Sequence, residues 1–141
     1  MAGRIVKQVA HVCIFAHDLK ATETFWTEVL GMPIAFRFTR NGAPYGFYLD
    51  AGGRTNVEVF QKTESSFTDA NQINHICLEV NDLDDAVEQI RAAGVKITDK
   101  KLGVDDTWQA WTADPNGVKI ELFEYTQESA QFIGGDRAAN W

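Results

Sequence analysis

The sequence has few of the residues that characterise fibrous or disulfide-rich proteins. With 3 Pro and 11 Gly in 141 residues, it is neither collagenous nor rich in linkers. Its only cysteines, Cys13 and Cys77, both lie inside apolar runs. This placement is typical of buried thiols and not of a disulfide framework.

Long hydrophobic runs and an excess of positive charge are also missing. The longest apolar stretch near the N-terminus, Val9–Ala16, is short and is interrupted by His11, so we expect neither a signal peptide nor a transmembrane span. Asp and Glu outnumber Lys and Arg by 20 to 13, which gives a net charge of −7. Without a basic run, we expect no nucleic-acid partner and no membrane partner. A cytoplasmic protein is the expectation.

The apolar content is sufficient for an ordinary globular core. Hydrophobic residues make up 45% of the chain, and 9 Phe, 4 Trp and 3 Tyr supply large side chains. We therefore expect one domain over residues 1–141, or two very small modules that share a core.

The chain contains an internal repeat with an offset of 63 to 64 residues. Three pairs of segments match in the same order: Val9–Leu19 with Ile73–Leu83, Tyr45–Thr55 with 108–118, and Asn56–Phe60 with Lys119–Phe123. The second of these aligns Tyr48 with Trp111. Three ordered matches indicate a duplicated module, at about 5–62 and 69–125, followed by a non-repeated tail over 126–141, which we expect to include a short helix.

Each module is predicted to have the element order βαβββ, which makes the fold class α+β. Alternating apolar residues predict first strands at Val6–Phe15 and Ile73–Val80. The helices are predicted at about Leu19–Leu30 and Leu83–Ala93, with N-caps at Asp18 and Asp82 and with Gly31 and Gly94 at their C-terminal ends. Hairpin turns are expected at 50–53 and 114–117.

Four polar residues occupy matched positions in the apolar strands of the two modules. His11 and His75 lie in the first strands, and Glu58 and Glu121 in the last. An isolated strand His is more often a hydrogen-bonded core side chain, and an isolated strand Glu usually faces solvent. A pseudo-twofold axis, however, would bring the matched positions together. Two imidazoles and two carboxylates suit a divalent transition ion such as Ni, Zn, Co, Mn or Fe. Cys13 and Cys77 are conceivable further ligands, although packing is favoured for both.

These residues carry a resemblance to a known family. His11-Val-Cys-Ile, Phe25-Trp-Thr-Glu-Val-Leu-Gly-Met and Asp114-Pro-Asn-Gly-Val-Lys-Ile-Glu-Leu-Phe-Glu resemble the vicinal oxygen chelate superfamily, and within it bacterial glyoxalase I. The resemblance covers about residues 5–125. It implies tandem βαβββ modules whose mixed sheet curls around a metal cleft. It also implies that His11, Glu58, His75 and Glu121 are the ligands, and that the protein is a homodimer in which a site can be shared between chains.

Two positions depart from the glyoxalase I pattern. Where that pattern has an arginine and an asparagine that hold glutathione, this chain has Phe15 and Lys62. Arg4, Lys7 or Arg37 could substitute for them.

The resemblance implies a lyase or isomerase that removes a proton next to a carbonyl. A small substrate with two neighbouring oxygens would chelate the ion, which acts as a Lewis acid, and a ligand carboxylate would serve as base. Glu121 is the first choice for that base and Glu58 the second. Trp111 and Tyr48 are candidate walls of the substrate pocket, or core residues. The open alternatives are a methylmalonyl-CoA epimerase-like enzyme, a ring-cleaving dioxygenase, a thiol transferase and a bleomycin-resistance-like binding protein.

Overall fold

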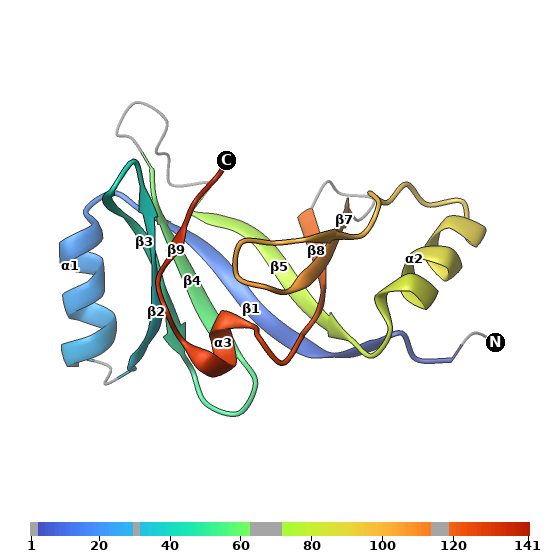
Figure 1. Cartoon of the computed structure of the whole chain (residues 1–141), viewed down its shortest axis with the longest axis horizontal. Coiled ribbons are helices and arrows are strands. Elements are labelled where there is room, and N and C mark those ends of the chain that lie inside the picture. Colours follow the sequence, from blue (N-terminus) through green and yellow to red (C-terminus); the bar gives the residue numbers. More distant parts are fainter. Residues whose placement is uncertain (1–2, 30–31, 63–71, 114–118) are drawn as a thin grey trace.

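The computed structural model describes residues 3–29, 32–62, 72–113 and 119–141. Its described strands form one nine-stranded mixed sheet with the order β6-β7-β8-β5-β1-β4-β3-β2-β9. The molecule is elongated, with α1 and α2 at its two ends and the sheet between them (Figure 1).

The first module contributes one helical segment and four strands. Its elements are β1 (Val6–Ala16), α1 (Leu19–Thr24), the π-helical turn η1 (Phe25–Val29), β2 (Ile34–Arg40), β3 (Ala43–Asp50) and β4 (Asn56–Gln61). The second module repeats this order with β5 (Ile73–Val80), α2 (Leu83–Ala92), β6 (Lys101–Leu102), β7 (Trp108–Ala113) and β8 (Lys119–Glu124). The tail contains α3 (Ala130–Ile133) and β9 (Arg137–Ala138). The predicted α+β fold with two βαβββ modules is therefore confirmed.

The two modules join in the middle of the sheet. Within each module the first and last strands are parallel neighbours, β1 with β4 and β5 with β8. Across the modules, β1 and β5 pair in antiparallel register, with His11 opposite Cys77 and Cys13 opposite His75. This pairing places the repeated positions around the line between β1 and β5, as a pseudo-twofold axis requires.

The helix termini follow the sequence signals. Asp82 Oδ1 accepts a hydrogen bond from Asp85 N at 2.9 Å, and Asp18 Oδ1 accepts one from Ala21 N at 2.8 Å. Gly94 has φ +79°, the left-handed conformation that ends a helix without a Cβ penalty. The helix predicted from Leu19 is α-helical only to Thr24 and continues as the π-helical turn. The predicted Leu30, Gly31 and the 114–117 turn lie outside the described residues.

Alternation along β3 and β4 separates two apolar layers. Phe47, Leu49 and Val59 pack on the face that α1 covers. Tyr48 and Phe60 pack with Phe36 and Phe38 in another cluster. Among the described residues, no helix has the length and hydropathy that crossing a membrane would require.

Candidate metal centre

The four matched residues come together within a single chain. They project from the four central strands of the sheet, His11 from β1, Glu58 from β4, His75 from β5 and Glu121 from β8. In the registers, Glu58 on β4 lies opposite Cys13 on β1, and Glu121 on β8 lies opposite Cys77 on β5. The two carboxylates are therefore one strand further from the β1–β5 line than the histidines. No residue of a second chain is needed to bring these four side chains together.

The distances of the two imidazole nitrogens from each other and from the carboxylate oxygens are close to those around one ion. His11 Nε2 lies 2.8 Å from His75 Nε2, and Glu121 Oε2 lies 3.1 Å from each of these nitrogens. Glu58 Oε1 is further away, at 3.5 Å from His11 and 3.6 Å from His75. Bonds of about 2.1 Å to one ion would separate adjacent ligands by about 3.0 Å in an octahedron and by about 3.4 Å in a tetrahedron.

The orientation of the two imidazoles favours metal binding. Asn74 Oδ1 accepts a hydrogen bond from His75 Nδ1 at 2.6 Å, so neutral His75 carries its lone pair on Nε2, which faces the quartet. On the opposite side, the hydroxyl group of Tyr48 contacts His11 Nδ1. If Nδ1 is the donor there, both Nε2 atoms present lone pairs to each other, and a cation between them relieves their repulsion.

Burial and charge set the protonation of the quartet. All four residues are buried. Burial raises the pKa of Glu58 to about 7 despite the opposing effect of His11. Burial also acts to raise the pKa of Glu121, but hydrogen bonds with His11 and His75 outweigh it and lower that pKa to about 2. Burial lowers the pKa of His75, whereas the carboxylates outweigh burial at His11 and raise its pKa. A divalent cation would compensate the two buried carboxylates.

The two cysteines are better explained by packing than by ligation. Cys13 and Cys77 are buried, in agreement with the sequence prediction. The sulfur of Cys77 lies within 4.8 Å of ligand atoms of His11 and Glu121. Burial nevertheless raises the pKa of both thiols, which disfavours the thiolate form that binds metals.

A cavity of about 620 Å³ opens onto the quartet. Glu58, His75 and Glu121 line it, together with Trp111, whose ring centroid lies 4.8 Å from that of His75. Trp111 stands opposite Glu121 in the β7–β8 register and lies in the wall of this cavity, one of the two places that the sequence left open for it. Of the two positions that depart from the glyoxalase I pattern, Phe15 lines the cavity and Lys62 lies with its Nζ 4.3 Å from the Phe15 ring centroid.

Of the two places left open for Tyr48 by the sequence, pocket wall or core, the structure gives it the core. Tyr48 is fully buried, and it is absent from the described cavity lining. It stands opposite Glu58 in the β3–β4 register, and its ring stacks on Phe36 at 4.8 Å, so its hydroxyl is directed at His11. Its position therefore suits orienting a ligand imidazole and not contacting a substrate.

Some residues at the site were not found from the sequence. Asp105 is a buried carboxylate in the cavity wall that accepts hydrogen bonds from Thr107 Oγ1 at 2.7 Å and Gln131 Nε2 at 2.8 Å, and burial raises its pKa. Asn140 and Trp141 of the tail also line the cavity. The repeat did not indicate these three residues, because Asp105 has no matching carboxylate in the first module and Asn140 and Trp141 lie outside the repeat. Asn74, which directly precedes a predicted ligand, could have been proposed as its hydrogen-bond partner.

The sequence profile of the Glyoxalase/Bleomycin resistance protein/Dioxygenase superfamily matches residues 8–122. The chain belongs to this superfamily. Lactoylglutathione lyase from Salmonella typhimurium is 30% identical over 124 residues, which cover 83% of this chain and 92% of the enzyme. The uncharacterised protein YwbC of Bacillus subtilis is 28% identical and covers 85% of this chain and 99% of its own length.

The fold of this superfamily member is also found among solved structures. Methylmalonyl-CoA epimerase from Mycobacterium tuberculosis superposes with a TM-score of 0.74 at 20% identity, covering 91% of this chain and 94% of the epimerase. At this identity the likeness concerns the fold alone. The profile match over residues 8–122 confirms the predicted membership of the vicinal oxygen chelate superfamily.

Proposed function

We propose that this protein is a metal-dependent lyase or isomerase of the glyoxalase type. Its substrate would be a small molecule with two neighbouring oxygens. The enzyme would remove a proton from the carbon next to the carbonyl of that substrate. The observation that carries this proposal is the convergence of His11, Glu58, His75 and Glu121 beside one cavity. The two imidazole nitrogens lie 2.8 Å from each other and 3.1 to 3.6 Å from an oxygen of each carboxylate. The similarity to lactoylglutathione lyase supports the reaction class.

The quartet holds the ion, and the cavity holds the substrate beside it. A divalent transition ion bound by these four residues would supply Lewis-acid polarisation of the substrate carbonyl. The strands bury His11 completely, and Asn74 and Tyr48 fix the imidazole orientations. A carboxylate oxygen of this chain then removes the proton from the carbon next to the carbonyl and returns it to the neighbouring carbon.

The two carboxylates differ in ways that favour Glu58 as this base. The sequence alone placed Glu121 first. Glu121 Oε2, however, lies 3.1 Å from both imidazole nitrogens, whereas Glu58 Oε1 is about half an ångström further from each. In the metal-free quartet, burial also raises the pKa of Glu58 to about 7, whereas that of Glu121 is lowered, so of the two carboxylates Glu58 takes up a proton more readily. We therefore propose Glu121 as a tightly held ligand and Glu58 as the proton carrier.

A paired substitution tests this assignment. The hemithioacetal of methylglyoxal and glutathione, and methylmalonyl-CoA, are offered to the parent protein, Glu58→Gln and Glu121→Gln in deuterated water at saturating metal. Glutamine keeps the volume and one oxygen but removes the base. We expect Glu58→Gln to lower deuterium incorporation at the substrate carbon by about 10²–10⁴-fold at metal content equal to the parent.

Other outcomes discriminate among the candidates. If Glu121→Gln is the variant that abolishes exchange at full metal content, Glu121 is the base and the assignment to Glu58 is wrong. Exchange with methylmalonyl-CoA alone would identify an epimerase that uses the same proton transfer. If the metal-loaded parent exchanges neither substrate nor any other dicarbonyl–thiol adduct, the proposed function fails.

A further inference from the structure

The C-terminal segment, residues 126–141, forms part of the cavity although it lies outside the repeat and beyond the superfamily match, which ends at residue 122. From the end of β8 in the second module, it runs to β2 at the far edge of the first module (Figure 1). Its β9 pairs in parallel with β2, and Ala139 N donates to Thr39 O at 2.7 Å.

The segment is fixed to the second module as well. Ala130 N donates to Asp105 O at 2.8 Å, and Gln131 Nε2 donates to Asp105 Oδ2 at 2.8 Å. Arg137 forms an ion pair with Asp106 at 3.3 Å. Because both modules hold the segment, its last residues keep a defined place at the cavity.

At that place, Trp141 adds a ring to an aromatic cluster of the first module. Its centroid lies 5.4 Å from that of Phe60 and 5.8 Å from that of Phe38, both in edge-to-face geometry, and 6.4 Å from that of Tyr45. Phe60 and Phe38 are buried beneath, whereas Trp141 is 55% exposed. All four rings line the cavity that holds the quartet. We call them the aromatic subsite.

The two sides of the cavity differ in charge. Apart from Glu58, the described lining side chains from the first module and the C-terminal segment carry no charge. Besides the quartet, the second module contributes the cations Lys101 and Lys119, the carboxylate Asp105, and the amides Asn74 and Gln109. A substrate held by its oxygens at the quartet would therefore extend toward aromatic rings on one side and toward charged and amide groups on the other.

We propose that the aromatic subsite binds an aromatic ring, or a similarly flat apolar group, of the substrate, and that Trp141 is a specificity-determining residue. This proposal rests on the proposed function, because it takes the quartet as the anchor for the substrate oxygens. Edge-to-face and offset-stacked contacts give such a ring its preferred partners, and the exposed part of Trp141 supplies the outer contact.

Two hydroxamates test the subsite by binding, without turnover. Benzohydroxamate and acetohydroxamate present the same chelating oxygen pair to the metal-loaded protein and differ only in the phenyl ring. By calorimetry, we expect the parent to bind benzohydroxamate more tightly. Trp141→Ala should weaken benzohydroxamate binding by about 2- to 10-fold, the range expected for one aromatic contact, and leave acetohydroxamate binding unchanged. Trp141→Phe should retain most of the preference.

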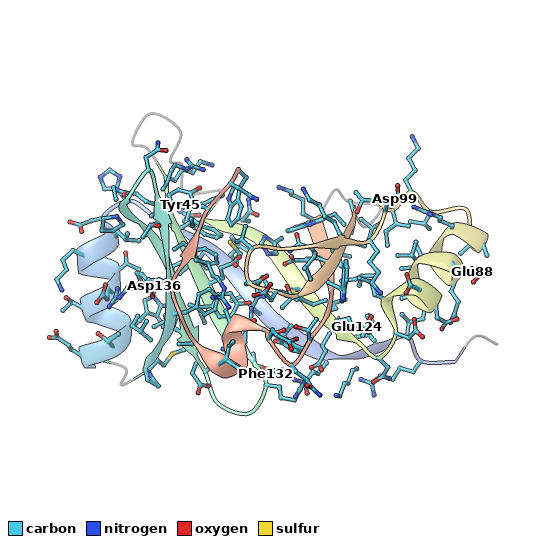
Figure 2. The ribbon with its side chains drawn as sticks, viewed as in Figure 1. Tyr45, Glu88, Asp99, Glu124, Phe132 and Asp136 are labelled. Atoms are coloured by element: carbon cyan, nitrogen blue, oxygen red, sulfur yellow. The ribbon has the colours of Figure 1, made fainter. Side chains whose placement is uncertain are left out.

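Phe132→Ala is the matched control. Phe132 belongs to the same segment and is 51% exposed, but its ring packs against Tyr125 and does not line the cavity. Figure 2 shows Phe132 on α3, well apart from Tyr45. This variant should change neither affinity, so it separates loss of the ring at the cavity from loosening of the segment.

The results distinguish the subsite from the proposed function. The subsite alone is overturned if the parent binds the two hydroxamates with equal affinity. It is also overturned if Trp141→Ala and Trp141→Phe weaken the binding of benzohydroxamate and of acetohydroxamate by the same factor. An intact aromatic preference in a protein that exchanges no substrate proton overturns the proposed function and supports the subsite. Failure of both hydroxamates to bind overturns both.

Discussion

Metal binding by the quartet should be measurable as thermal stability, because an ion that binds only the folded chain stabilises it. At a free metal concentration of about 100 times Kd, the added free energy of unfolding is about 2.7 kcal/mol. Unfolding entropy of about 2.1 cal/mol/K per residue gives about 0.3 kcal/mol/K for a chain of 141 residues. The expected rise in Tm over the metal-free protein is therefore about 9 °C.

Glu121→Gln should remove most of this rise. Its carboxylate lies 3.1 Å from both imidazole nitrogens, so the substitution removes a negative ligand from the closest contact in the quartet. A 100-fold loss of affinity would bring the same metal concentration down to about Kd, where binding adds only about 0.4 kcal/mol. The rise in Tm should then fall to about 1–2 °C.

Glu79→Gln provides the control for loss of a buried carboxylate. Glu79 lies on β5, like His75, but it is paired with Lys7 at 3.2 Å and with Arg54 at 3.1 Å, outside the quartet. This variant should lower the Tm of the metal-free protein, because two cations lose their partner, while the metal still raises Tm by about 9 °C.

The assay is differential scanning calorimetry of metal-stripped protein with and without Ni²⁺, Zn²⁺ or Co²⁺, with bound metal counted by elemental analysis. Equal metal-induced shifts in the parent and Glu121→Gln would refute the reasoning. So would one bound ion per chain in a variant that lacks both His11 and His75.

Three further predictions concern pH, orientation of the ligands and assembly. In the metal-free protein, the pKa of Glu58 lies at about 7, above its model-compound value of 4.5, so its stabilising contribution is complete below pH about 4.5 and is lost as pH rises through 7. A metal must displace that proton, so the metal-induced rise in Tm should be larger at pH 8 than at pH 5.5, and a pH-independent shift would contradict this. Tyr48→Phe should weaken metal affinity by about 10- to 100-fold, as measured by competition with a chelator, while Phe36→Leu, a change one ring away, should not. The superfamily resemblance predicts a homodimer, and sedimentation that finds a monomer at micromolar concentration would exclude it.

The sequence determined the repeat and, with it, the arrangement of the centre. Matching offsets of His11 with His75 and of Glu58 with Glu121 were sufficient to predict a shared site, because a duplicated module places equivalent residues symmetrically. The helix starts at Asp18 and Asp82 were likewise predictable, since capping depends on contacts within one turn. Periodicity, caps and repeats are local or symmetric signals, and these are the ones that a single sequence carries.

Only the tertiary structure decided what surrounds the quartet. Tyr48 and Trp111 are repeat partners, yet Tyr48 is buried against His11 while Trp111 lines the cavity. Their strands have equivalent neighbours, but β2 has seven residues and stacks Phe36 on Tyr48, whereas β6 has only two. The difference between Glu58 and Glu121 in distance to the imidazoles also has no counterpart in the repeat. Trp141 reaches the cavity because both modules hold the segment before it, through contacts between residues far apart in the chain. Such contacts depend on packing in three dimensions, which no local pattern or internal symmetry encodes.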